Sequence, residues 1–286
     1  MLSHFQAVVL GLLQGVSELF PISSLGHTVI LPGLLGWAID QNANDFLTFV
    51  VATHFATALV LLLAYGEDWA RIVSGLLGLI GGRDSYPTNR YAKLGMLLIV
   101  GTIPAGAIGF LLQKRLERLF ISPASAACFF TLNGGLLYAA ECLRRKARSS
   151  EGLAGIDQHV AAKMCWWQAV KVGIAQILAL LPGFSRTGSA IAGGLLVGLS
   201  HEEALRFSFL LATPIIGAAA LLKLPMLIHS GSADAIENAL AGGVSAAVTA
   251  FASIKILTRY FQTKTLTHFA IYCAAVGSLS LIILWK

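Results

Sequence analysis

Residues 14–27 read QGVSELFPISSLGH and place a carboxylate, hydroxyl groups and an imidazole in sequence that is otherwise apolar enough to enter a bilayer. Ionisable side chains are costly at membrane depth and usually face a cavity or one another. Glu18 and His27 are therefore candidate functional residues. Pro21 lies between them and favours a break in the helix, because proline has no backbone N–H to donate. The stretch predicts a broken, re-entrant helix.

The composition around this stretch is that of a polytopic membrane protein. The 286 residues are 56% hydrophobic and only 12% charged, which is outside the range of soluble domains. Six stretches are long and apolar enough to cross about 30 Å of hydrocarbon as helices. They cover roughly residues 43–65, 91–112, 121–143, 203–223, 235–258 and 266–285. We interpret a shorter apolar stretch at 69–82 as an interfacial helix.

The basic residues predict an orientation in the membrane. The net charge is +6, but a cluster of four basic residues at 144–148 directly follows a predicted span. Such a cluster marks a cytoplasmic loop and argues against nucleic-acid binding. When the six spans alternate sides from that anchor, most other lysines and arginines also fall inside. Residues 14–27 then open toward the outer face.

A second polar interruption reads PGFSRTGS at residues 182–189. It resembles the first one, since three residues recur 162 positions later: Gln14, Ser23 and Gly26 return as Gln176, Ser185 and Gly188. Three spans follow each interruption, so the two interruptions enter from opposite faces, as in an inverted repeat. We predict an all-α polytopic membrane protein with about six transmembrane helices and two re-entrant segments. It forms a single membrane domain over 1–286, with inverted pseudo-repeats at about 1–150 and 151–286.

The polar residues of the two interruptions suit a phosphate ligand. Ser23 or Ser24 begins a half-helix, and the unpaired amides at such a start bind anions. Arg186 can bond two phosphate oxygens at once. If the two interruptions meet, their side chains form one site with the groups that phosphoryl transfer needs. The predicted site contains Glu18, Ser23, Ser24, His27, Ser185, Arg186 and Thr187.

Structural interpretations of the same residues stay open at this point. Glu18 and Arg186 could form a structural ion pair, and His27 could be a packing histidine. Serine and threonine hydroxyls in membrane helices often bond a preceding carbonyl. We expect His54 to be structural or to contact a site residue. Five other polar residues are interpreted as solvated: Glu141, His159, His201, Glu202 and Glu203.

Three motifs resemble a known family. They are Gln-x-x-x-Glu at 14–18, Pro-x-Ser-Ser-x-Gly-His at 21–27 and Pro-Gly-x-Ser-Arg-x-Gly at 182–188, and together they resemble the bacitracin-resistance type of undecaprenyl-diphosphate phosphatase. Residues 203–214 also resemble the family's segment after the last motif. The resemblance implies a hydrolase of the bacterial inner membrane that removes the terminal phosphate of undecaprenyl diphosphate at the periplasmic face. It would recycle the lipid carrier for cell-wall synthesis and confer bacitracin resistance.

The resemblance also implies roles for individual residues. The family's catalytic positions fall on Glu18, Ser24, His27 and Arg186. A divalent metal, Mg²⁺ or Ca²⁺, is implied, with Glu18 as its ligand. We expect substrate contacts from Gln14, Ser23, Ser185 and Thr187. Many family members have glutamate where Gln14 stands, and we would expect glutamine where His54 stands. The expected partners are a polyprenyl diphosphate lipid and membrane lipids, and a homodimer is compatible with the sequence.

Two mechanisms and two other functions are consistent with the residues. In the first mechanism Ser24 attacks phosphorus, His27 takes its proton, and Arg186 with the helix amides holds the oxyanions. In the second, a metal-activated water attacks directly. A secondary transporter or lipid flippase is the alternative function, since broken helices in inverted repeats also occur there. Type-2 phosphatidic acid phosphatases use similar residues, but their Lys-x-x-x-x-x-x-Arg-Pro element is absent from the sequence.

Overall fold

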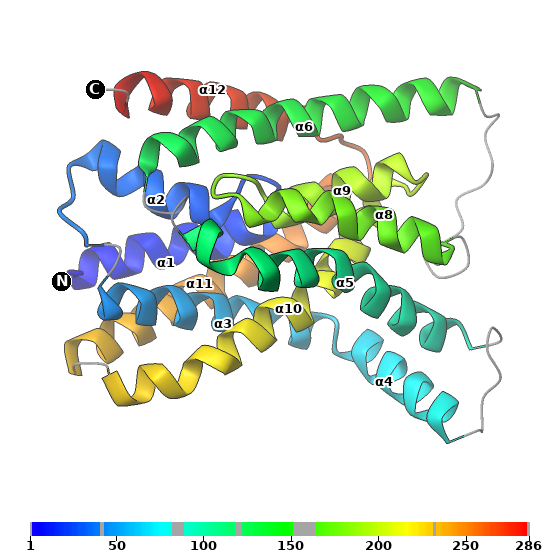
Figure 1. Cartoon of the computed structure of the whole chain (residues 1–286), viewed down its shortest axis with the longest axis horizontal. Helices are drawn as coiled ribbons and strands as arrows, with labels where there is room; N and C mark the ends of the chain where they lie inside the picture. Colours follow the sequence, from blue (N-terminus) through cyan, green and yellow to red (C-terminus); the bar gives the residue numbers. More distant parts are fainter. Residues whose placement is uncertain are drawn as a thin grey trace.

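The computed structural model describes residues 2–40, 43–81, 89–117, 122–150, 164–230 and 233–284. These residues form helices and no strands, which confirms the predicted all-α class (Figure 1). The first half contains α1 (His4–Leu19), α2 (Ser24–Leu35), α3 (Asn44–Ala64), α4 (Gly66–Ile80), α5 (Arg90–Glu117) and α6 (Pro123–Ser150). The second half contains α8 (Trp166–Gln176), the 3₁₀ helix η2 (Ile177–Leu180), α9 (Arg186–Leu196), α10 (His201–Ser230), α11 (Ala233–Tyr260) and α12 (Thr267–Leu284).

Six of these helices are long and apolar enough to cross a membrane, as predicted. The spans run over 44–64, 90–112, 123–146, 201–221, 233–260 and 267–284. Helix α4 has only 15 residues and lies outside this set. Helix α4 is too short to be a span, because about 20 apolar residues are needed to cross the hydrocarbon. The interfacial position of α4 remains a prediction.

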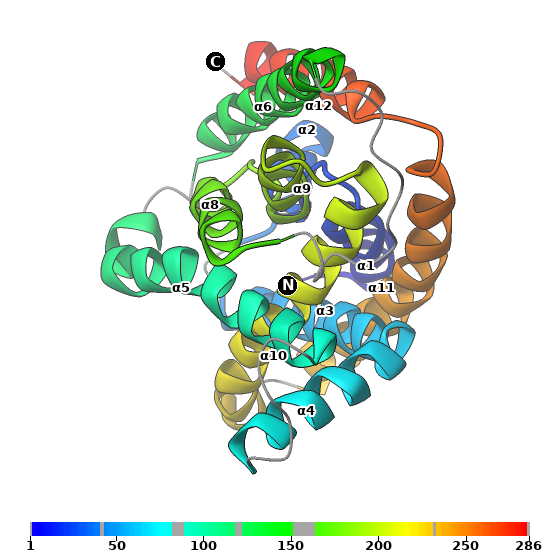
Figure 2. The same ribbon diagram turned by 90° about the vertical axis from the view of Figure 1, so that its right-hand side faces the viewer.

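The two polar interruptions form the predicted breaks. Helix α1 ends at Leu19, Phe20 is extended, and α2 begins at Ser24. Helix α8 continues into η2, and α9 then begins at Arg186. Figure 1 shows α1–α2 and α8–α9 as two hairpins that enter from opposite ends of the molecule. Figure 2 shows these short helices in the middle, with long helices around them. The sequence repeat itself remains a prediction.

Small residues bring the re-entrant helices close to the spans. Helix α1 packs against α11, and a Cβ on Gly11 would lie 2.4 Å from the carbonyl oxygen of Gly242. A Cβ on Gly15 would lie 2.1 Å from the carbonyl oxygen of Ala246. Membrane helices associate through such contacts, because the lipid tails give no hydrophobic drive toward pairing. These glycines therefore allow α1 to lie close against α11.

The structure corrects one sequence-based interpretation. Glu141, His201 and Glu203 are buried rather than solvated. Glu141 Oε2 and His201 Nε2 lie 2.7 Å apart and pair α6 with α10. Burial is tolerated because each polar group satisfies the other, an arrangement that proximity to loops in sequence does not reveal. Glu202 is exposed as expected, and His159 lies outside the described residues.

Candidate active site

The breaks of the two hairpins meet inside the bundle. Thr187, in the first turn of α9, donates its hydroxyl hydrogen to the carbonyl oxygen of Glu18 at 2.9 Å. A Cβ on Gly26, in the first turn of α2, would lie 3.3 Å from the Cα of Gly183. Gly183 also has a φ of 109°, which a residue with a side chain rarely adopts. The loop before α9 can therefore approach α2 because glycines stand at the contact.

Glu18 is the centre of the candidate site. Its carboxylate is buried, and Oε2 accepts hydrogen bonds from the Gln14 amide at 3.1 Å and from the Ser24 hydroxyl. His54 Nε2 lies 3.4 Å from the same oxygen, and an Arg186 nitrogen lies 3.9 Å from Oε1. A buried carboxylate needs such partners, because an isolated charge is very costly to desolvate. Three helices, α1, α2 and α3, and the start of α9 thus supply one polar cluster.

The hydroxyls of Ser23 and Ser185 cap the two half-helices. Ser23 Oγ accepts from the amide of Gly26 at 3.1 Å, and Ser185 Oγ accepts from the amide of Gly188 at 3.0 Å. Both are N-caps, as the sequence predicted for a helix start. Ser23 has a φ of 65°, the one positive value among the non-glycine residues that the structure describes. Such strain persists only where its surroundings enforce it, and it often occurs at functional sites.

His27 lies beside Ser24 in sequence but pairs with other groups. Its Nδ1 is 2.7 Å from the Ser23 carbonyl oxygen, and its Nε2 is 2.9 Å from the Tyr272 hydroxyl. The carbonyl can only accept, so Nδ1 carries a proton, and in the neutral ring Nε2 accepts from Tyr272. The Tyr272 ring also stacks on the imidazole at an interplanar angle of 13°. The proton of Ser24 is therefore directed to Glu18 rather than to His27.

Arg186 is a partly exposed positive charge in the site. Its side chain is 25% exposed, whereas that of Glu18 is 4% exposed. The two groups are separated by 3.9 Å, which is longer than a direct hydrogen bond. The guanidinium therefore keeps N–H donors available to hydrogen-bond two oxygens of a phosphate. Glu18 also accepts hydrogen bonds from Gln14 and Ser24, so a purely structural Glu18–Arg186 pair is a poorer description.

Asn133 is a positioning residue that the sequence did not single out. It is fully buried in α6, and its side chain bonds both breaks. Nδ2 donates to the carbonyl of Pro21 at 3.1 Å, and Oδ1 accepts from the amide of Ser185 at 3.1 Å. One amide thus fastens the two hairpin tips to the same span. The available signal was a lone polar side chain in the middle of an apolar span.

The donor set limits how a metal could bind. No group of three His, Cys, Asp or Glu side chains suitable for a metal occurs within the described ranges. Glu18 supplies one carboxylate, and Gln14 stands where a second would be useful. Mg²⁺ commonly takes one or two protein carboxylates together with substrate phosphates and water. These residues therefore fit an ion that is carried by a diphosphate, and they do not form a closed protein cage.

Comparisons with known proteins cover almost the whole chain. The family described as Bacitracin resistance protein BacA matches residues 7–279. A protein of Mycolicibacterium paratuberculosis named undecaprenyl-diphosphatase is 44% identical over 299 residues, which cover 98% of this chain and 97% of the relative. An Acidiphilium cryptum protein of the same name is 45% identical, with 97% of each chain covered. A Chromobacterium violaceum protein named undecaprenyl-diphosphatase 2 is 42% identical, covering 98% of this chain and 99% of the relative.

Proposed function

The chain belongs to the bacitracin resistance protein BacA family, and on this premise we propose that its Glu18 cluster hydrolyses undecaprenyl diphosphate. The products are undecaprenyl phosphate and inorganic phosphate. The protein is thus a membrane hydrolase that returns the carrier lipid to cell-wall synthesis and confers bacitracin resistance. The observation that supports this most directly is the meeting of Glu18, Ser24 and Arg186 at two helix breaks. A carboxylate, a hydroxyl and a guanidinium meet the main needs of phosphoryl transfer.

The first step forms a phosphoserine. Ser24 Oγ attacks the terminal phosphorus, and its proton passes to Glu18 Oε2, which already accepts that hydrogen bond. The bond from the terminal phosphorus to the bridging oxygen breaks, and its electron pair leaves with undecaprenyl phosphate. Arg186 and the amides at the start of α2 and α9 hold the charged oxygens in place. In this scheme Ser23 and Ser185 act by presenting these amides, while Gln14 and Thr187 position Glu18.

The second step releases inorganic phosphate. Water attacks the phosphorus, the bond to Ser24 Oγ breaks, and Ser24 regains its proton from Glu18. The proton of the water passes to the Tyr272 oxygen as the Tyr272 hydroxyl gives its own proton to His27 Nε2. That hydrogen bond spans 2.9 Å. After phosphate leaves, His27 returns this proton through Tyr272 to solvent, which restores the neutral ring. We assign His27 to the water rather than to Ser24, because Ser24 bonds Glu18 while His27 bonds the Ser23 carbonyl and Tyr272.

We infer that a divalent ion, Mg²⁺ or Ca²⁺, accompanies the diphosphate. Glu18 Oε1 would be its protein ligand, because Oε2 already accepts hydrogen bonds from Gln14 and Ser24. When bound, the ion would neutralise part of the charge on the phosphate oxygens. This is the usual contribution of such ions to phosphoryl transfer.

We infer further that the site opens to the periplasm from the inner membrane. The support is the basic cluster at 144–148, which lies at the C-terminal end of α6 and marks the cytoplasmic side. The hairpin α1–α2 enters from the opposite side when the six spans alternate. A homodimer also remains a prediction.

Phosphate release by the purified, full-length protein tests this function. Undecaprenyl diphosphate in detergent with Mg²⁺ should yield inorganic phosphate with the wild type. Glu18→Ala, Ser24→Ala and Arg186→Ala should each lose at least about 100-fold in turnover, as is usual when acid–base or oxyanion groups are removed. Ser245→Ala is the matched control, since that hydroxyl bonds only the Ala241 carbonyl of its own helix. Normal turnover in all three site variants would refute the assignment.

A further inference from the structure

Helix α11 presents an apolar stripe on the outside of the bundle. Leu240, Val244, Val248 and Phe251 are between 52% and 66% exposed. They are three or four residues apart, so they lie on one helix face. Other faces of α11 pack against α1 and α3. The stripe is roughly 17 Å long at 1.5 Å per residue, and hydrocarbon chains of the bilayer can lie against it.

Two cations continue this stripe at the C-terminal end of α11. Lys255 and Arg259 follow Phe251 at four-residue intervals, and both are exposed. Neither side chain has an ion pair or a hydrogen bond with a residue that the structure describes. The Lys255 ammonium lies over the Phe251 ring, 4.4 Å from its centroid. Lysines at helix ends often extend toward water instead, so this contact keeps the ammonium beside the apolar stripe.

The charge at this end of α11 lacks acidic partners. No aspartate or glutamate follows Glu237 in the sequence, whereas Lys255, Arg259 and Lys264 do. A recess that Thr258 lines holds acidic residues of α4 and α10. None of these acids pairs with Lys255 or Arg259 within the described ranges. An anionic ligand would therefore meet two unpaired cations.

The depth and length of the stripe indicate which anion this is. Cations next to the end of a membrane span attract anionic lipid headgroups, and arginine can bond two oxygens of one phosphate. A stripe of roughly 17 Å, at 1.5 Å per residue, suits one acyl chain of a phospholipid. A polyprenyl chain would extend well past Leu240.

We propose that the C-terminal end of α11 binds a glycerophospholipid with a net negative headgroup. Its phosphate lies on Lys255 and Arg259, and one acyl chain lies along the stripe from Phe251 to Leu240. A zwitterionic phospholipid would place its own ammonium beside these cations and would bind less well. The site is separate from the Glu18 cluster and takes no part in the hydrolysis of the diphosphate.

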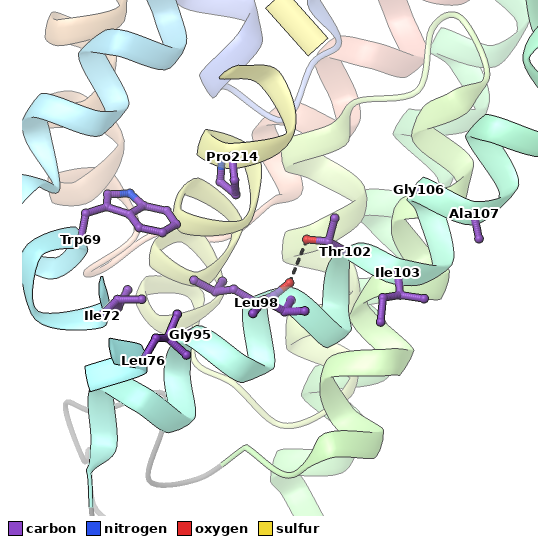
Figure 3. A pocket seen from close by; sticks show the side chains of 11 residues that line it. Trp69, Ile72, Leu76, Gly95, Leu98, Thr102, Ile103, Gly106, Ala107 and Pro214 are labelled. Atoms are coloured by element: carbon purple, nitrogen blue, oxygen red, sulfur yellow. Dashed lines mark hydrogen bonds between the residues drawn. The ribbon is translucent and has the colours of Figure 1, made fainter. Parts of the chain in front are cut away.

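Photo-crosslinking to the full-length protein in phosphatidylcholine nanodiscs tests the proposal. The probes are phosphatidylglycerol and phosphatidylethanolamine, each with a diazirine in one acyl chain, and labelling of residues 240–251 is quantified. Residues 95–107 are the internal reference. They line a groove whose described lining carries no charged residue (Figure 3), and Ile99 and Ile103 there are 50% and 58% exposed. No cation in that groove selects a headgroup.

A matched pair of double variants separates this site from the general charge of the protein. Lys255→Gln with Arg259→Gln removes the two cations of the site. Arg90→Gln with Lys93→Gln is the control, since it removes two cations from the first turn of α5. Relative to the reference, we expect phosphatidylglycerol to label residues 240–251 at least about fivefold more than phosphatidylethanolamine. The control should keep this preference, and the α11 variant should lose it.

Three outcomes would overturn the proposal. The first is equal labelling by the two probes in the wild type, which needs no variant to fold. The second is an equal loss of preference in both double variants, which would indicate a general attraction of anionic lipid. The third is stronger labelling by a diazirine-bearing polyprenyl phosphate than by phosphatidylglycerol, which would assign the site to the carrier lipid. Phosphate release should stay unchanged in both variants, so it tests the proposed function separately.

Discussion

At the scale of single residues, Glu18 organises the site because it is a buried charge with several partners. Gln14, Ser24 and His54 all point at one of its oxygens, and Arg186 approaches the other. The hydroxyl of Ser24 is oriented by this carboxylate before any ligand arrives.

Tyr272→Phe tests the proton path through His27. The change removes the hydroxyl bonded to His27 Nε2 and leaves the stacked ring. We expect kcat to fall about tenfold with KM nearly unchanged, and phosphorylated enzyme to accumulate, since the lost hydrogen bond serves the second step. Rapid-quench kinetics would measure both. Tyr138→Phe on α6 is the control, and a KM effect without phosphoenzyme would contradict the assigned role.

Only some residues of this site could be predicted from the sequence. Glu18, Ser24 and Arg186 stood out because charged or clustered polar residues are unusual in apolar sequence. Asn133 and Tyr272 come from two different spans, and each is one polar residue among apolar neighbours. The partner of Ser24 was also misjudged, because three-residue spacing places His27 near it but does not fix which group receives the proton.

At the scale of helices, the predicted spans agree with the structure to within a few residues. Hydropathy determines them, because the thickness of the bilayer sets their length. Which helices pack together was not predicted. Helix α1 packs on α11, and α8 packs on α5. These pairs depend on small residues whose partners are far away in sequence: a Cβ on Gly173 would lie 2.3 Å from the Gly101 carbonyl oxygen.

Gly15→Ala tests the packing of α1 on α11. The new methyl group would collide with the Ala246 carbonyl oxygen. Overpacking of this kind costs about 1–3 kcal/mol, so we expect a lower thermal unfolding midpoint in detergent and reduced phosphate release, because Glu18 lies on the same helix. Gly135→Ala is the matched control, because nothing lies within 4 Å of its added Cβ. Equal unfolding midpoints for the two variants would argue against close α1–α11 packing.

At the scale of the whole molecule, two hairpins entering from opposite ends make one site from two distant parts of the chain (Figure 1). Each half supplies what the other lacks: Glu18 and Ser24 come from the first, and Arg186 from the second. The sequence predicted this opposition because three spans follow each interruption. It did not predict the bonds that hold the tips together.

The orientation of the molecule can be measured with matched cysteines. Glu237→Cys at the start of α11 and Glu67→Cys near the start of α4 both replace exposed glutamates. In a variant whose four native cysteines are replaced by alanine, a membrane-impermeant maleimide added to spheroplasts should label position 237 and spare position 67. Detergent should expose both. The reverse pattern would place the site on the cytoplasmic side.

The most direct test of the central claim is a search for phosphate on Ser24. Undecaprenyl diphosphate labelled in its terminal phosphate is mixed with the purified protein, the reaction is quenched within one turnover, and the peptide is identified by mass spectrometry. Our account predicts label on Ser24 in the wild type, more of it in His27→Ala, and none in Ser24→Ala, which also releases no phosphate. Full phosphate release by Ser24→Ala, with no labelled protein in the wild type, would contradict it.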